Sequence, residues 1–255
     1  MSKILDYSEK IPDSYWQKPA QCGQLVEDNY NGKGLCAYLP FGFDNSKPLN
    51  IAYFAMGTSN KATQFFNWPN YVKGYNHVID NLIQNGEIDP IVIVVIDGNK
   101  PNTAWLKYNA LGLVQYVEGK VLSYANLDTS IPSLVNSSVH RSCGGWSLGS
   151  IDLARLVVND IGNDFYKLFH WYNIQSGYNA TGMDKIDPNL FVSCVCGSAD
   201  DGGCVTFTSQ CMKYFSQNPP LNHDVAQIIR GYTHMITYQL NYFYNAIRYF
   251  FGTDK

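Results

Sequence analysis

The residues most suited to chemistry in this sequence lie in the segment Gly145-Trp146-Ser147-Leu148-Gly149. A Gly-x-Ser-x-Gly pattern is typical of a sharp turn between a strand and a helix, which pushes the serine hydroxyl into the open. The two glycines are needed because side chains there would collide across so tight a turn. Apolar residues at helical spacing follow. The pattern therefore predicts an exposed nucleophile, although a plain Gly-Ser loop before a helix could carry the same letters.

A serine hydroxyl attacks well only when a base accepts its proton and an acid orients that base. In chains with this motif the order is serine, acid, histidine. Residues 191–196 are expected to form a strand, and Asp200 and Asp201 follow it. Both would lie at the edge of the sheet where Ser147 opens. We take Asp200 as the acid; the alternatives are Asp201, or a solvated turn in which neither residue takes part.

Two histidines follow these aspartates. His234 precedes a terminal apolar helix, which is where the base of such a site is expected. His223 lies in a proline-rich stretch that indicates a surface turn. We therefore take His234 as the base.

The negative oxygen that forms during acyl transfer needs two fixed N–H donors, an oxyanion hole. One expected donor is the backbone N–H of Leu148, directly after the serine. The second should come from the loop after an earlier strand, at Gly57 or Thr58. A glycine turn after any strand would look the same, so both residues remain candidates.

Three tryptophans are candidates for stacking on an aromatic substrate, namely Trp146, Trp105 and Trp171, although large aromatic residues usually belong to the core. No metal and no organic cofactor are expected, because no second Cys/His pair accompanies Cys194-x-Cys196. The seven cysteines are interpreted as small buried hydrophobic residues, with one or two disulfides as the alternative.

Composition limits the class of partner. The chain has 255 residues, and its 18 Lys plus Arg against 21 Asp plus Glu give a formal net charge of −3. Without a basic run, no nucleic-acid partner is expected. The longest aliphatic run, 91–96, is too short to span a membrane, so no membrane partner is expected either. The length fits one large domain. We assign residues 1–20 to an irregular lead-in and 21–255 to the catalytic domain.

Strands and helices alternate along the chain. The dipeptide Asn31-Gly32 predicts a tight turn and thus an N-terminal β-hairpin. Residues 99–110 and 170–189 lack periodicity and are expected to be binding loops. Further strands are expected at 50–56, 90–96, 140–144 and 190–196, and helices at 70–85, 113–124 and 236–250. This order predicts the α/β class, with a single mostly parallel sheet flanked by helices.

Several motifs resemble those of feruloyl esterases of carbohydrate esterase family 1, related to esterase D and to the feruloyl esterase modules of bacterial xylanases. The matching features span roughly residues 23–251. They comprise segments 23–27, 37–43 and 79–86, His140-Arg141 before the serine motif, Cys196-Gly197-x-x-Asp200 and Gly231-x-x-His234. The chain departs from the family at Met56, where the family usually has His before the glycine, and at Leu148, where it often has Met.

The resemblance implies an α/β-hydrolase fold with Ser147, Asp200 and His234 as the catalytic triad. It also implies a secreted serine esterase that removes hydroxycinnamoyl groups such as ferulate from arabinoxylan through an acyl-enzyme. The implied partner is a feruloylated polysaccharide or oligosaccharide, and a place in a larger cellulosomal or multimodular enzyme is compatible with it.

Other interpretations remain open. The same residues could serve an acetylxylan esterase or a general carboxylesterase. A non-catalytic carbohydrate-binding or scaffold-associated module could keep the fold, and a cytosolic thioester hydrolase would be favoured if all cysteines are reduced. The sequons at Asn136 and Asn179 favour secretion. Residues 1–20 lack the apolar core of a signal peptide, which fits either a cytosolic protein or a signal already removed.

Overall fold

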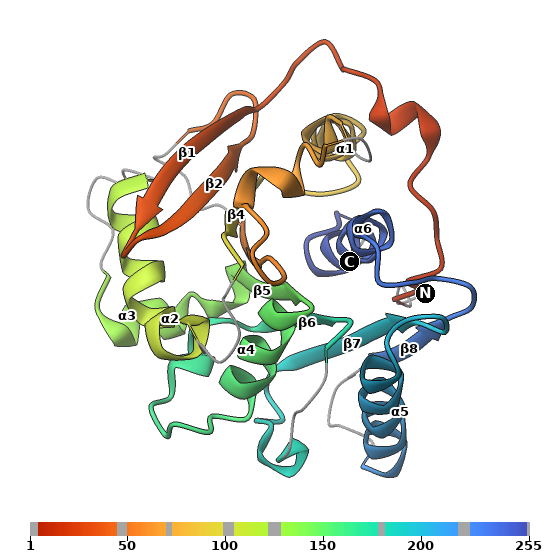
Figure 1. The fold of residues 1–255 in the computed structure, drawn as a ribbon. Helices are drawn as coiled ribbons and strands as arrows, with labels where there is room; N and C mark the ends of the chain where they lie inside the picture. Colours follow the sequence, from red (N-terminus) through yellow and green to blue (C-terminus); the bar gives the residue numbers. More distant parts are fainter. Residues whose placement is uncertain are drawn as a thin grey trace.

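The computed structural model describes residues 5–44, 50–69, 73–98, 105–121, 129–177, 182–218 and 225–253. Within them, eight strands form one central sheet in the order β1-β2-β4-β3-β5-β6-β7-β8 (Figure 1). The strands are β1 (Gln24–Tyr30), β2 (Lys33–Leu39), β3 (Asn50–Ala55), β4 (Ile91–Ile96), β5 (Arg141–Trp146), β6 (Trp171–Gln175), β7 (Phe191–Gly197) and β8 (Val225–Ile229). β2 pairs antiparallel with β1 and β4, and every other pairing is parallel. The predicted α/β sheet is confirmed.

Local sequence explains the regular elements at the start of the sheet. Asn31 and Gly32 have φ of 50° and 76°, the left-handed pair that a tight hairpin turn requires. β4 consists of six aliphatic residues that are all buried, as expected of a parallel strand covered on both faces. The hairpin and this strand therefore form as predicted.

Helices cover both faces of the sheet. They are α1 (Tyr75–Gln84), α2 (Trp105–Tyr116), α3 (Ile131–Asn136), α4 (Leu148–Val157), α5 (Gly202–Gln217) and α6 (Ile236–Phe250), with a π-helical turn at Val117–Val121 and 3₁₀ turns at Asp13–Trp16, Ala62–Phe65, Ser138–His140, Phe165–Leu168 and Met183–Lys185. α1 and α6 share one buried cluster, whereas α2 to α5 contribute to the cluster on the other face. The apolar stripe predicted for the terminal helix is buried.

The N-terminal lead-in contributes to the buried cluster that contains α1 and α6 (Figure 1). Leu5 and Tyr7 are fully buried, and the Tyr7 ring packs against Tyr242 on α6. The Tyr7 hydroxyl donates to Ser193 Oγ on β7 at 2.7 Å, and its N–H donates to Gln227 on β8 at 3.0 Å. The Ile11 N–H donates to Asn241 on α6 at 3.0 Å. Apart from one 3₁₀ turn the described lead-in is irregular, but it is bound to the domain throughout.

The structure corrects four predicted boundaries. The first helix begins at Tyr75, because Gly74 at φ 71° has a left-handed conformation that a helix cannot include. The aperiodic region 99–110 contains the start of α2, and the region 170–189 contains β6; β8 was also missed. The strand before Ser147, predicted at 140–144, begins at Arg141 and ends at Trp146, because His140 belongs to a 3₁₀ turn. Positions 70–72, 99–104, Tyr124, Asn179 and His223 lie outside the described residues.

All seven cysteines are described, and all are free thiols. Six of them are buried, as predicted for small hydrophobic residues, and the alternative of one or two disulfides is not realised. No helix in the described part of the chain is both long and apolar enough to cross a membrane.

Candidate active site

Ser147 occupies a strained turn between β5 and α4. Its φ of 56° and ψ of −120° lie in a region that residues with a side chain rarely adopt, at a cost of about 1–3 kcal/mol. The turn is held by the Ser147 N–H, which donates to the Gln175 carbonyl on β6 at 3.1 Å. The sharp strand-to-helix turn predicted from the sequence is therefore confirmed.

The two motif glycines allow this turn to form. A Cβ on Gly145 would lie 2.6 Å from the backbone carbon of Gly149. A Cβ on Gly149 would lie 2.3 Å from the Ala55 carbonyl oxygen on β3. Both distances are far below van der Waals contact, so any larger residue would push α4 away from the sheet.

His234 meets Asp200 at the carboxyl edge of the same sheet. His234 lies on the loop between β8 and α6, and its Nδ1 is 2.7 Å from Asp200 Oδ1. Asp201 instead caps α5, because its side chain accepts the Gly203 N–H at 2.8 Å. Of the two predicted alternatives, the structure brings Asp200 to the histidine.

Asp200 is an ionised carboxylate surrounded by donors. Its side chain has no exposed surface, whereas that of His234 is 34% exposed. Burial alone would raise the pKa of Asp200, but hydrogen bonds from His234 and Ser176 outweigh burial and lower it below its ordinary value. A fixed negative charge beside Nδ1 holds the proton there and leaves the other ring nitrogen free to act as a base.

Sequence reasoning missed two residues that hold Asp200. Ser176, which follows β6, donates its hydroxyl to Asp200 Oδ2 at 2.5 Å. Gln239 on α6 in turn donates to Ser176 Oγ at 3.0 Å. Ser176 has φ 46° and its N–H donates to the Val195 carbonyl on β7, so its place is fixed by the sheet. The signal that could have found Ser176 was its position directly after β6, the strand that was missed.

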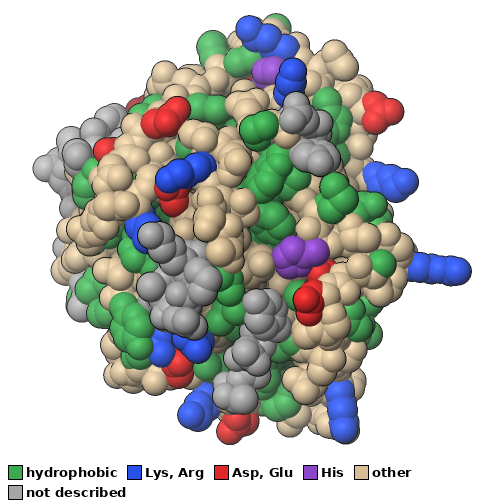
Figure 2. All heavy atoms as spheres, viewed as in Figure 1, with side chains coloured by type: hydrophobic (Ala, Val, Ile, Leu, Met, Phe, Trp, Pro, Cys, Tyr) green, Lys and Arg blue, Asp and Glu red, His purple; other side chains and the backbone are tan. Residues whose placement is uncertain are grey.

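The loop of His234 crosses close to the end of β7. A Cβ on Gly197 would lie 1.9 Å from the Tyr232 carbonyl oxygen, so only glycine allows this crossing. The His234 ring lies 5.4 Å from the Trp146 ring, which also meets Trp68 at 6.0 Å. On the face drawn in Figure 2, a histidine side chain reaches the surface beside an acidic side chain and a group of hydrophobic ones.

Backbone donors face the serine from two sides. Leu148 begins α4, so its N–H has no partner within the helix. An atom at the Cβ position of Gly57 would be 3.1 Å from Ser147 Cβ, which places the loop after β3 directly against the serine. Thr58, next in the loop, is exposed. Within the described ranges the N–H groups of Gly57, Thr58 and Leu148 have no acceptor. The oxyanion assignment remains a prediction, and its geometry favours Gly57 and Leu148.

The three tryptophans predicted to contact the substrate lie in different places. Trp146 borders the site through its contact with His234. Trp105 lies in the core beside Tyr30 and is 9% exposed, so its contact with a substrate remains a prediction. Trp171 was wrongly assigned: it begins β6 and pairs with Ser142, at the amino end of the strands and opposite Ser147. Its ring stacks on Phe250 instead.

Three side chains at the site could be considered as metal ligands. Atoms of Asp200, Cys204 and His234 lie within 4.8 Å of one another. However, Asp200 and His234 are already bonded to each other, and burial raises the pKa of the Cys204 thiol well above its ordinary value. A thiol that stays protonated is a poor ligand. The group suits proton transfer better than metal binding.

Comparisons with known proteins show which proteins this chain resembles. No protein-family model matches the chain. It is 28% identical to endo-1,4-beta-xylanase Y of Acetivibrio thermocellus over 94% of its own length, and spans 24% of that protein. It is similar in structure to a mutant feruloyl esterase module from Clostridium thermocellum complexed with sinapinate, with a TM-score of 0.79, 25% identity and coverage of 98% and 95% of the two chains.

A more distant structure gives the fold alone. The S-formylglutathione hydrolase of Staphylococcus aureus matches with a TM-score of 0.59 at 12% identity, covering 92% of this chain and 99% of that one. The chain thus has the α/β-hydrolase fold, and the predicted resemblance to feruloyl esterases is confirmed.

Proposed function

We propose that this chain is a serine esterase that releases hydroxycinnamic acids such as ferulate from esterified plant cell-wall xylan. The observation that carries the proposal is the Asp200–His234 hydrogen bond at the sheet edge that also presents Ser147 on its strained turn. Support for the substrate class comes from the similarity to a feruloyl esterase module and to a xylanase.

In the proposed reaction, His234 takes the proton of Ser147 as the serine oxygen attacks the ester carbonyl. Asp200 stabilises the resulting imidazolium. The N–H groups of Leu148 and of the Gly57 loop stabilise the negative oxygen. His234 then gives the proton to the departing alcohol, which leaves an acyl-enzyme. Water repeats the sequence, frees the acid and restores Ser147. These five assignments follow from position and hydrogen bonding, and no metal or organic cofactor takes part in them.

The aromatic acyl group is assigned to the side of the site that Trp146 lines. Trp146 lies next to Ser147 in sequence, its ring meets those of Trp68 and His234, and only 6% of its surface is exposed. Its indole N–H is buried with no acceptor in the described residues.

We place the enzyme outside the cell and within a longer multimodular protein. The similarity to a xylanase of which the chain spans 24% supports both statements. The division into a lead-in at 1–20 and a catalytic domain at 21–255 also remains a proposal, in which the lead-in is hydrogen-bonded to β7, β8 and α6 of that domain.

The test is hydrolysis of methyl ferulate beside 4-nitrophenyl acetate, for the wild type and for Ser147→Ala. We expect ferulate release that the mutation lowers about 10⁶-fold. Activity on acetate alone would keep the mechanism and favour an acetylxylan esterase or a general carboxylesterase. Activity that survives the mutation would refute the assignment of Ser147, and no activity on any ester would favour a non-catalytic module.

A thioester hydrolase is the second candidate, and the free state of all seven cysteines favours it. Free thiols fit a reducing compartment better than the exterior of a cell. The same assay with a glutathione thioester separates the two candidates. A higher kcat/KM on methyl ferulate favours the esterase, and a higher kcat/KM on the thioester favours the thioester hydrolase.

A further inference from the structure

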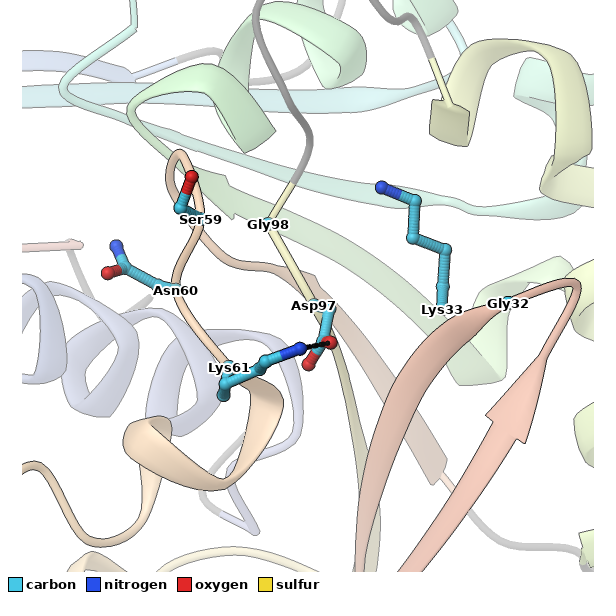
Figure 3. Close-up of a pocket in the computed structure, with 7 residues that line it drawn as sticks. All are labelled: Gly32, Lys33, Ser59, Asn60, Lys61, Asp97 and Gly98. Atoms are coloured by element: carbon cyan, nitrogen blue, oxygen red, sulfur yellow. Dashed lines mark hydrogen bonds and ion pairs between the residues drawn. The ribbon is translucent and has the colours of Figure 1, made fainter.

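A pocket lined by charged and polar residues lies beside the loop that faces Ser147, and nothing in the proposed reaction uses it (Figure 3). Its volume is about 380 Å³. The lining comes from the hairpin turn, the loop after β3 and the end of β4, namely Gly32, Lys33, Ser59, Asn60, Lys61, Asp97 and Gly98. Three segments that are far apart in sequence therefore form one site.

The pocket adjoins the serine through one residue. The Cβ position of Gly57 would lie 3.1 Å from Ser147 Cβ on one side and 3.3 Å from Asn60 Nδ2 on the other. Asn60 is fixed there, because its N–H donates to the Gly57 carbonyl and its carbonyl accepts the Gly98 N–H at 2.8 Å. Gly57 thus lies in the immediate neighbourhood of both the serine and the Asn60 amide.

The pocket has a rigid floor. The Asp97 carboxylate accepts hydrogen bonds from the Lys61 ammonium at 2.9 Å and from the Ala62 N–H at 2.8 Å. Its own N–H donates to the Gly34 carbonyl in the hairpin. Because these bonds join all three segments, the lining is already organised and little order has to be gained on binding.

Lys33 supplies an ammonium group to the pocket, and its charge also acts on the buried Asp152 carboxyl. Its ammonium forms no ion pair within the described ranges, whereas Lys61 is paired with Asp97. Figure 3 shows Lys33 on one side of the β4 end at Gly98, and Ser59 and Asn60 on the other. Ammonium, amide and hydroxyl groups together bind hydroxyl and ring oxygens. No aromatic ring lines the pocket in the described residues, so it does not suit the acyl ring.

We infer that this pocket binds the saccharide half of the ester, the alcohol that leaves when Ser147 is acylated. The inference rests on the proposed function, in which one half of the substrate is aromatic and the other is rich in hydroxyl groups. Trp146 provides an apolar wall for the first half, and the pocket of Lys33 and Asn60 provides polar groups for the second. Lys33 is then a specificity residue that acts on the leaving group alone.

The first experiment compares kcat/KM of the wild type, Lys33→Met and Lys33→Arg on a feruloylated arabinoxylo-oligosaccharide and on methyl ferulate. Met keeps the stem of the side chain and removes the charge. We expect about a tenfold loss on the saccharide ester, mainly in KM, with methyl ferulate unchanged. Lys33→Arg should retain most of the preference. Lys213→Met, an exposed lysine on α5, is the matched control.

An equal loss on both esters, or no loss on either, would overturn the inference while leaving the esterase intact. A second experiment separates it from the proposed function. Ser147→Ala is titrated with the unesterified oligosaccharide by calorimetry, alone and combined with Lys33→Met. Weaker binding in the double variant supports the pocket even if ferulate is not the natural acyl group. Equal binding in both proteins refutes it. The melting temperature of each variant checks that the hairpin still folds.

Discussion

Ser176 and His234 hold opposite oxygens of one carboxylate: the Ser176 hydroxyl donates to Oδ2 of Asp200, and His234 Nδ1 lies against Oδ1. The orientation of Asp200 is therefore fixed from the sheet on one side and from the loop before α6 on the other. The Asp201 N–H also donates to Oδ1, at 2.7 Å. This arrangement makes Ser176 a positioning residue, and it leads to the first two predictions.

Asp200→Asn should lower kcat on ester substrates about 10⁴-fold, because an amide favours the wrong histidine tautomer and cannot stabilise the imidazolium. Asp201→Ala should keep near wild-type activity. It should lose about 1 kcal/mol of stability, since Asp201 caps α5 through the Gly203 N–H. Kinetics and thermal unfolding of both variants test the assignment. Comparable losses of activity in the two would contradict it.

Ser176→Ala should reduce kcat about tenfold and leave KM nearly unchanged, because the donor to Asp200 Oδ2 is lost while the substrate pocket is not altered. That donor helps to lower the pKa of Asp200. Without it the pKa of Asp200 rises, so the loss of activity that follows protonation of Asp200 should begin at a higher pH. Ser209→Ala, whose hydroxyl only bonds within α5, is the control. A loss that begins at an unchanged pH would argue that Ser176 is merely structural.

Gly197→Ala should cost several kcal/mol of stability and most of the activity. Its Cβ would meet the Tyr232 carbonyl oxygen at 1.9 Å and displace the chain two residues before His234. Gly202→Ala provides the contrast, because nothing lies within 4 Å of a Cβ there. That variant should be neutral or slightly more stable, as expected for alanine in a first helical turn. Denaturant unfolding and ester hydrolysis are the measurements.

A buried carboxylate away from the chemistry gives a pH prediction. Burial raises the pKa of Asp152 on α4 to about 7. Its unfolded value is about 3.9, so the folded protein binds more protons between about pH 4 and 7, and stability decreases as pH rises through that window. Asp152→Asn keeps an acceptor for the Leu106 N–H and removes the charge.

The variant should therefore melt roughly 5 °C above the wild type at pH 8, and the two should melt alike near pH 4. Asp184→Asn removes an exposed charge and should change neither value. If Asp152→Asn is destabilised at both pH values alike, the carboxylate is bound in its charged form and the stated direction of the pKa shift is wrong.

Local signals predicted the parts of the fold that depend on neighbouring residues. The Asn31-Gly32 turn, the aliphatic β4 and the Gly145–Gly149 elbow all follow from short patterns. β6 was missed because its alternate residues Asn173 and Gln175 are polar and yet buried. Asn173 is satisfied by the Tyr7 hydroxyl, 166 residues away, and no local pattern reveals such a partner.

In the candidate site, too, only some of the residues could be predicted from local sequence. Ser147, Asp200 and His234 could be proposed because the motif and the chain order are known for this type of site. Ser176 and Gln239 could not, since their roles depend on the packing of α6 against β6 and β7. Trp171 shows the limit of residue type as a guide. The pairing register puts it at the amino end of its strand, away from Ser147.

The bonds of the lead-in have a consequence for biosynthesis. The backbone N–H groups of Tyr7 and Ile11 donate to the side chains of Gln227 and Asn241, which are synthesised more than two hundred residues later. Until then the apolar side chains of Leu5 and Tyr7 have no place in the core. Contacts between residues so far apart in sequence slow folding, and they leave an aggregation-prone apolar segment exposed on the nascent chain. The lead-in is therefore synthesised before the rest of this domain but settles among the last of its segments, and we expect chaperones to act on it during synthesis.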